Sequence, residues 1–177
     1  GGPPAMTAAT RSVRRACVGV VALGLVASCG GDDDGGGENS WVGNIQAAMV
    51  AVEDVRGSGQ EYFEVTAGPR LTNVFVAVED ATAAVPYVFL DGELQEPAPV
   101  LDGASGFTFA LDDVDIDDEA ILSTIEAELP EVTIDALSVE GGPDDTVRYV
   151  VSARSEQGGV LDITVGPDGA VFAVDPL

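Results

Sequence analysis

Two stretches of the chain repeat one another, and this repetition limits the possible folds more than any other feature of the sequence. EVTAGPRLTNVFVAV at 64–78 aligns without a gap with SVEGGPDDTVRYVVS at 138–152. GFTFALDD at 106–113 likewise matches GAVFAVDP at 169–176 in its Gly, Phe, Ala and Asp. The first match pairs Phe75 with Tyr149 and has five identities: Val65/Val139, Gly68/Gly142, Pro69/Pro143, Thr72/Thr146 and Val76/Val150. Repeated segments indicate one structural unit used twice, so we predict two copies of a helix followed by four strands.

The first copy is predicted to open with a helix at 41–57, which Ser40 caps and Gly57 ends in the αL conformation. Trp41 is expected to pack at the helix entry. Apolar residues recur at helical spacing on one face of this helix: Ile45, Ala48, Met49, Val52 and Val55. The strands that follow are EYFEVTA, with Phe63 and Val65 on one side, NVFVAVE, VPYVFLDGEL with a hairpin turn at Asp91-Gly92, and GFTFALDD. An extra loop, QEPAPVLDGAS at 95–105, precedes the fourth strand.

The second copy repeats this order. Its helix is predicted to begin at Asp117 or Asp118 and to stop at Pro130, with Ile121, Ile125 and Leu129 buried. The expected strands are VTIDALSV, TVRYVVSAR, VLDITV and AVFAVD. In the second of these, alternation places one set of side chains on the core face: Val147, Tyr149, Val151 and Ala153. Leu161, Ile163 and Val165 should share a side in the third.

A helix on one face of an antiparallel sheet is an α+β arrangement, so the predicted fold is two tandem helix-plus-antiparallel-sheet repeats with the helices packed on the sheet. The repeats are assigned to residues 41–112 and 113–177. They could join edge to edge into one sheet or pack as two sheets with the helices shielded. Such tandem helix-plus-sheet repeats resemble the PepSY-like and β-lactamase-inhibitor-protein-like modules of exported bacterial proteins. That resemblance implies a non-catalytic binding or inhibitory module outside the cytoplasm.

The N-terminal 28 residues have the layout of a signal peptide. RSVRR forms a basic stretch, and ACVGVVALGLVAS at 16–28 is an apolar segment too short for a stable membrane-spanning helix. Residues 1–5 precede Met6 and do not look like a natural start. Residues 29–40 are predicted to form a flexible, acidic, glycine-rich linker.

The run Leu25-Val26-Ala27-Ser28-Cys29 resembles the lipobox of bacterial lipoproteins. The resemblance implies that the Cys29 thiol is acylated and that the signal is cleaved between Ser28 and Cys29. Membrane lipid would then be one partner, and the protein would lie on the outer face of the cytoplasmic membrane of an actinobacterial-type bacterium. The alternative is ordinary secretory cleavage beside a chance cysteine.

Charge and composition exclude several functions. The segment after Cys29 carries 31 acidic residues and four arginines, a formal charge of −27, so it should repel nucleic acid. This acidity either solvates the surface or forms a face for cations or a basic partner. The chain has no histidine and no lysine, which removes histidine-based triads, histidine metal ligands and Schiff-base lysines. We therefore expect no enzyme and no cofactor, although chemistry by carboxylates alone is a remaining alternative.

The best candidate for a metal site is DDVDIDDE at 112–119. Asp113, Asp115 and Asp117 have the spacing of the first ligands of an EF-hand loop. The sixth position is then Asp118 where glycine is needed, and the twelfth is Thr124 where a glutamate belongs. Capping of the second helix explains these acids better, so no metal site is predicted.

The sequence therefore favours a lipid-anchored protein with a binding or protein-interaction domain, whose partner could be an envelope protein. The sheet surface and the 95–105 loop are the expected contact regions. The alternative is a small-molecule or lipid carrier with a cavity between sheet and helices.

Overall fold

The computed structural model describes residues 40–177. The predicted signal peptide, the acylated cysteine and nearly all of the linker lie outside the described residues. The first half contains η1 (Ser40–Gly43), α1 (Asn44–Arg56), β1 (Glu61–Ala67), β2 (Leu71–Val78), β3 (Ala83–Leu90), β4 (Glu93–Leu94), β5 (Leu101–Asp102) and β6 (Phe109–Ala110). The second half contains η2 (Leu111–Asp113), α2 (Asp118–Glu128), β7 (Val132–Gly141), η3 (Pro143–Asp145), β8 (Val147–Ser155), β9 (Val160–Val165) and β10 (Val171–Pro176).

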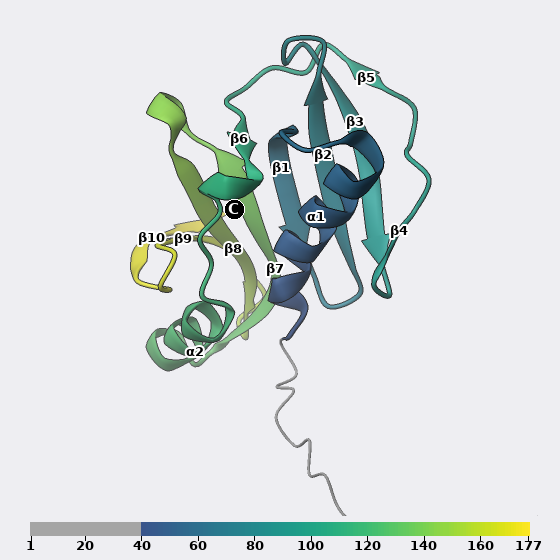
Figure 1. Ribbon diagram of the computed structural model, residues 1–177. Helices are drawn as coiled ribbons and strands as arrows, with labels where there is room; N and C mark the ends of the chain where they lie inside the picture. The colour runs from purple at the N-terminus through teal and green to yellow at the C-terminus, as the bar shows by residue number, and fades with distance from the viewer. Residues whose placement is uncertain (1–39) are drawn as a thin grey trace, which may run out of the picture. The chain divides into compact units, whose positions relative to one another are not determined.

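The two halves form one continuous antiparallel sheet. Within residues 40–177 its strand order is β10-β9-β8-β7-β1-β2-β3-β4, with β5 paired to β3 and β6 to β1 (Figure 1). The first strand of each half, β1 and β7, pair with each other at the centre. Of the two arrangements that the sequence left open, the structure therefore has the edge-to-edge one.

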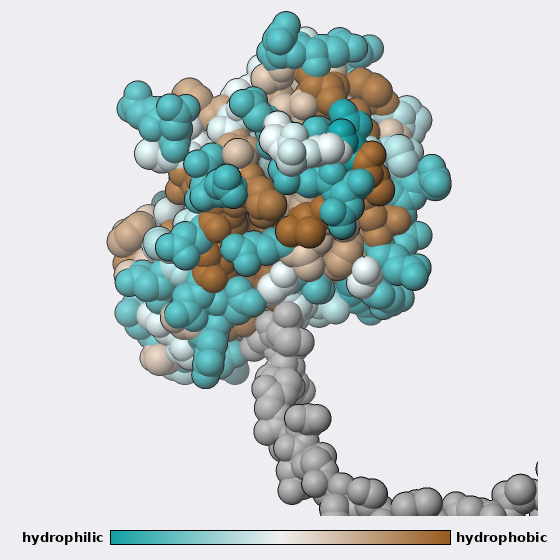
Figure 2. All heavy atoms as spheres, in the orientation of Figure 1, coloured by the Kyte–Doolittle hydropathy of each residue, from teal (hydrophilic) through white to brown (hydrophobic). Residues whose placement is uncertain are grey.

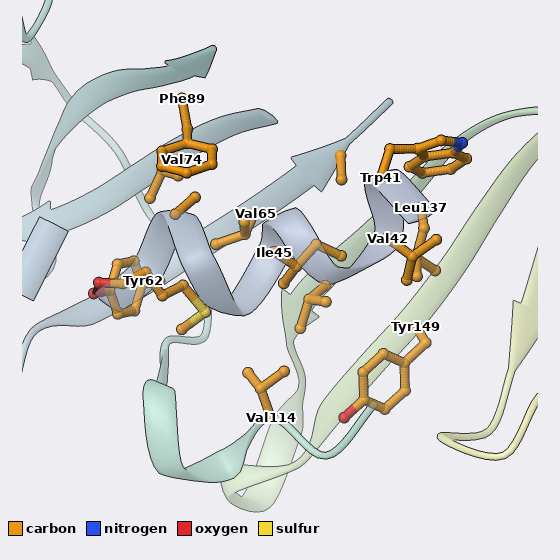
Figure 3. Packing of buried hydrophobic residues seen from close by; sticks show 14 of the residues in the cluster. Trp41, Val42, Ile45, Tyr62, Val65, Val74, Phe89, Val114, Leu137 and Tyr149 are labelled. Carbon is orange, nitrogen blue, oxygen red and sulfur yellow. Dashed lines mark hydrogen bonds between the residues drawn. The ribbon is translucent and has the colours of Figure 1, made fainter. Parts of the chain in front are cut away.

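Both helices pack on the same side of this sheet, in front of it in Figure 1. Alternate strand residues point to that side and form one core with the helices. Ile45 of α1 and Val65 of β1 lie in this core and have no exposed surface (Figure 3). Met49 of α1 and Ile121 and Ile125 of α2 are likewise fully buried. Trp41 is 6% exposed, so its predicted packing at the helix entry is confirmed. The predicted α+β class, with helices packed on the sheet, is confirmed.

The ends of the helices agree with the sequence only in part. Asp117 caps α2 as predicted, since its Oδ1 accepts a hydrogen bond from the Ala120 amide at 2.9 Å. The cap predicted for the first helix is wrong. A 3₁₀ turn precedes α1, the N-cap is Gly43, and no side chain caps it. Gly57 ends α1 with φ +96° and ψ 156°, which is not the αL conformation.

One predicted side-chain position is wrong, and one residue on a predicted face is exposed. Val55 lies in the last turn of α1 and is 66% exposed, whereas the other four apolar residues of its face are buried. Phe63 does not share a side with Val65, because the pairing of β1 with β2 shifts register between Tyr62 and Glu64. This β-bulge adds one residue, so Tyr62 and Val65 both point into the core and Phe63 does not.

The fourth strand of the first copy also differs from the prediction. In the second half, β10 pairs with β9 as expected. The segment GFTFALDD instead gives only β6, which pairs with β1, and then the 3₁₀ turn η2. The edge of β3 is occupied by β4 and β5, so 106–113 and 169–176 are not structural equivalents.

The hairpin turns show where the ungapped sequence match fails. The Gly68 amide bonds the Leu71 carbonyl at 3.0 Å, whereas the Gly142 amide bonds the Thr146 carbonyl at 2.7 Å. The second loop is therefore one residue longer. Val65 faces Val74 across its hairpin, and Val139 faces Tyr149, so Tyr149 corresponds to Val74 and the predicted match with Phe75 is wrong.

Candidate interaction surface

The side of the sheet opposite the helices is the candidate functional surface, and we call it the open face. It carries the strand residues that alternate with those of the core. Across its centre most of these are polar and half-buried: Glu64, Thr66, Asn73, Ser138, Glu140, Ser152, Asp162 and Thr164. The apolar Val150 lies between Ser138 and Thr164 in the register and is buried. No helix of the described residues packs on this side (Figure 1).

Hydrogen bonds between side chains join neighbouring strands at the centre of the open face. The hydroxyls of Thr66 on β1 and Ser138 on β7 lie 2.8 Å apart. Thr66 also donates to the Glu64 carboxylate, and Ser152 on β8 donates to Asp162 on β9 at 3.0 Å. These hydrogen bonds hold polar side chains together within and between neighbouring strands at the centre of the open face.

Two glutamates face each other beside this centre. Glu64 of β1 and Glu140 of β7 are directly opposite in the register, an arrangement that is unfavourable for like charges. Arg148 pairs with Glu140 at 3.6 Å. Burial raises the pKa of Glu140 above its ordinary value, and the charges of Glu64 and Asp162 act in the same direction, while Arg148 lowers it.

The loop at 95–105, which the sequence indicated as a contact region, lies against the outer edge of the sheet. Its backbone amides bond carbonyls of β3 and the turn before it: Gln95 to Val88 at 2.8 Å, Ala98 to Pro86 at 2.9 Å and Gly103 to Thr82 at 3.0 Å. Recesses border this loop on both sides of the sheet.

The recess on the open face has a volume of about 340 Å³. The rings of Phe63 and Phe75 line it, together with the acids Glu64 and Asp102 and the loop residues Leu101 to Ser105. Both rings are half-buried. The sequence did not indicate the two phenylalanines as site residues, because Phe63 reaches this side only through the bulge.

The recess on the helix side has a volume of about 470 Å³ and lies between the end of α1 and the same loop. Arg56 lines it and donates to the neutral acceptors Gln60 Oε1 at 3.0 Å and Tyr87 Oη at 3.3 Å. On this helix-bearing face, hydrophilic residues separate the exposed hydrophobic ones (Figure 2).

The acidic residues with EF-hand-like spacing take part in hydrogen bonds that involve the backbone. Asp113 accepts from the Ala110 amide at 2.8 Å and Asp117 caps α2. The backbone of Asp115 exchanges two hydrogen bonds with the Tyr149 hydroxyl, at 3.0 and 3.1 Å. In residues 40–177, no group of three or more acids or cysteines could hold a metal ion.

The space between sheet and helices, which a carrier would need as a cavity, is filled by the core. Side chains from both helices and from the strands meet there with no exposed surface, among them Ile45, Ile121, Val65 and Val139. The two recesses beside the 95–105 loop are lined mostly by half-buried and exposed residues. Residues 40–177 contain no helix long and apolar enough to cross a membrane.

Comparison with known proteins supports the fold and leaves the family open. No protein-family model matches the chain, and no curated protein matches its sequence. The fold resembles the crystal structure of a protein from Clostridium difficile 630 that is provisionally classed as a lipoprotein. The two are 14% identical with a TM-score of 0.57, over 73% of this chain and 90% of the other. At this identity the likeness shows a shared fold.

Proposed function

We propose that this protein is a lipid-anchored, non-catalytic interaction module that contacts a partner protein through the open face of its sheet. The observation that carries the proposal is the one-sided cover of the sheet: both helices lie on one side, and the other presents mostly polar side chains. Many sheets have one face exposed to water, but a face without helices beside a recess lined by two phenylalanines offers both area and an anchoring point for a partner.

The anchor is proposed at Cys29, which lies outside the described residues. Its support is the lipobox-like run before it, together with the shared fold of the clostridial protein classed as a lipoprotein. Acyl chains on Cys29 would hold the domain at the outer face of the cytoplasmic membrane. Residues 30–40 would give it reach from the bilayer. Cys29→Ser should abolish membrane retention, and normal retention of this variant would contradict the anchor.

The contact surface is tested by two matched substitutions. Leu71 lies at the start of β2 on the open face and is 36% exposed, and Val50 lies on the outer side of α1 and is 47% exposed. Each is replaced by arginine in the full chain, and proteins that co-purify from crosslinked envelopes are compared with wild type. Leu71→Arg should remove a partner that Val50→Arg retains. Loss with both variants, or with Val50→Arg alone, would contradict the open face as the contact surface.

A further inference from the structure

We propose that the recess on the open face receives a cationic side chain, an arginine or a lysine, from the partner protein. This inference rests on the proposed function, because it names the chemistry by which that partner is held. The recess is the 340 Å³ hollow lined by Phe63, Phe75, Glu64 and Asp102. Its volume lies at the lower end of small-ligand sites, which suits one long side chain better than a large ligand.

The strand register brings the aromatic rings and one carboxylate together. Glu64 of β1 and Phe75 of β2 are direct partners across the hairpin. The bulge between Tyr62 and Glu64 places the extra residue, Phe63, beside them. Bulges often redirect a side chain at a functional site. This one turns the ring of Phe63 away from the core and onto the open face.

The loop forms the remaining wall, with Leu101 beside Ala84 in the register and the backbone of Asp102 next to it. Asp102 belongs to β5, which pairs with the start of β3. Farther along, a side-chain carbon placed on Gly106 would lie 3.8 Å from the Phe63 ring, so the chain passes near this ring and leaves room beside it. Aromatic faces next to carboxylates favour a cation, since the ring quadrupole and the acids attract the same charge. A guanidinium can stack on a ring and bond a carboxylate at once.

Charges around the recess favour the same occupant. Glu64 faces Glu140 across β1 and β7, and Arg148 pairs with Glu140. A cation held by Glu64 would offset the repulsion between the two glutamates. On a larger scale, 31 acids less the four that precede residue 40 leave 27 in the described part, against four arginines. This excess attracts a basic partner and guides its approach.

The test uses the full chain and two labelled peptides, acetyl-Gly-Ser-Arg-Ser-Gly-amide and its Gln counterpart. Binding is measured by fluorescence anisotropy at low salt. The arginine peptide should bind about tenfold more tightly than the glutamine peptide, because only it carries the charge. Glu64→Gln and Phe63→Leu should each weaken it about fivefold, the first by removing charge and the second by removing the aromatic face. Melting temperatures check that both variants remain folded.

The matched control is Glu93→Gln, which removes the same charge from an exposed site in the β4 hairpin. It should leave binding of the arginine peptide unchanged. Equal affinity for the two peptides would contradict the recess as a site for a cationic side chain. Equal losses of affinity from Glu93→Gln and Glu64→Gln would contradict it as well. If spermidine binds to the recess more tightly than the peptide does, the recess is a site for a free polyamine. That result would contradict a side chain of a partner protein as its occupant. If Leu71→Arg removes the envelope partner while Glu64→Gln and Phe63→Leu retain it, this inference fails and the proposed function stands.

Discussion

Val65 of β1 and Val139 of β7 lie directly opposite each other at the centre of the sheet, and they are also the matched valines of the two repeats. When equivalent residues face each other, a two-fold axis relates the paired strands. Glu64 opposite Glu140 on one side of this pair is therefore the counterpart of Thr66 opposite Ser138 on the other. The backbone is symmetric here and the side chains are not, which gives the open face an acidic end and a hydroxyl end.

Thr72 should be a site where removal of a polar group stabilises the domain. Its hydroxyl is fully buried and has no hydrogen-bond partner, and the register of the second half places Val147 at the equivalent position. Thr72→Val should raise the free energy of unfolding by about 1 kcal/mol, because an unpaired buried hydroxyl is costly. Thr66→Val is the control: its hydroxyl is bonded to Ser138, so urea unfolding should show a loss. A loss for Thr72→Val would contradict the described environment.

Gly169 should tolerate no side chain. It has φ +85°, and a Cβ there would lie 2.7 Å from the Ala120 carbonyl oxygen and the Ile121 Cα of α2. Gly158 also has a positive φ, +92°, but a Cβ there would meet nothing within 4 Å. Gly158→Ala should therefore cost about 1 kcal/mol from backbone strain alone, and Gly169→Ala roughly 3 kcal/mol, measured by thermal unfolding. Equal losses of stability from Gly158→Ala and Gly169→Ala would show that the turn at Gly169 is not in close contact with α2.

The raised pKa of Glu140 predicts the direction in which folding stability changes with pH. Because its pKa is higher in the folded state than in the unfolded chain, folding takes up a proton between the two values. This residue's contribution to stability therefore falls as pH rises from the ordinary glutamate value through the folded pKa. Glu140→Gln should increase the melting temperature relative to wild type at neutral pH, and the gain should disappear at pH 3. In a protein that already carries Glu64→Gln, the gain in melting temperature from Glu140→Gln should be smaller, because the charge of Glu64 no longer repels Glu140.

The acids before α2 should behave as caps. Asp117→Ala should cost about 1 kcal/mol, because the Ala120 amide loses its acceptor. Asp115→Ala should cost much less, since the contacts of Asp115 to Tyr149 use its backbone. Millimolar calcium should shift the melting temperature of wild type by less than about one degree. A larger calcium shift that both substitutions abolish would instead indicate a metal site.

Local signals in the sequence were sufficient for several elements. The acidic start and terminal proline of 117–130 predicted α2, and Asp91-Gly92 predicted a turn that the structure forms with positive φ at both residues. These features depend on neighbouring residues alone, so a single sequence reveals them. The alternation in TVRYVVSAR likewise predicted the buried side of β8.

Features that depend on which residues of two strands face each other were not predictable. The bulge at Phe63 and the longer loop after Gly142 each shift a strand by one residue, which reverses the side on which the following residues point. The recess on the open face depends on that bulge and on the loop at 95–105, which lies in another part of the chain. No contiguous sequence motif therefore predicts it. The sequence did indicate the loop at 95–105, because the second copy has no counterpart of it.

Site-specific photo-crosslinking in living cells tests the open face most directly. A photoreactive phenylalanine replaces Leu71 on the open face or, in a matched chain, Val50 on α1, and irradiated envelopes are separated and probed for the protein. The proposed function predicts a discrete adduct of higher mass from position 71 and none from position 50. An adduct from position 50 alone, or the same adduct from both, would contradict the open face as the surface through which this protein acts.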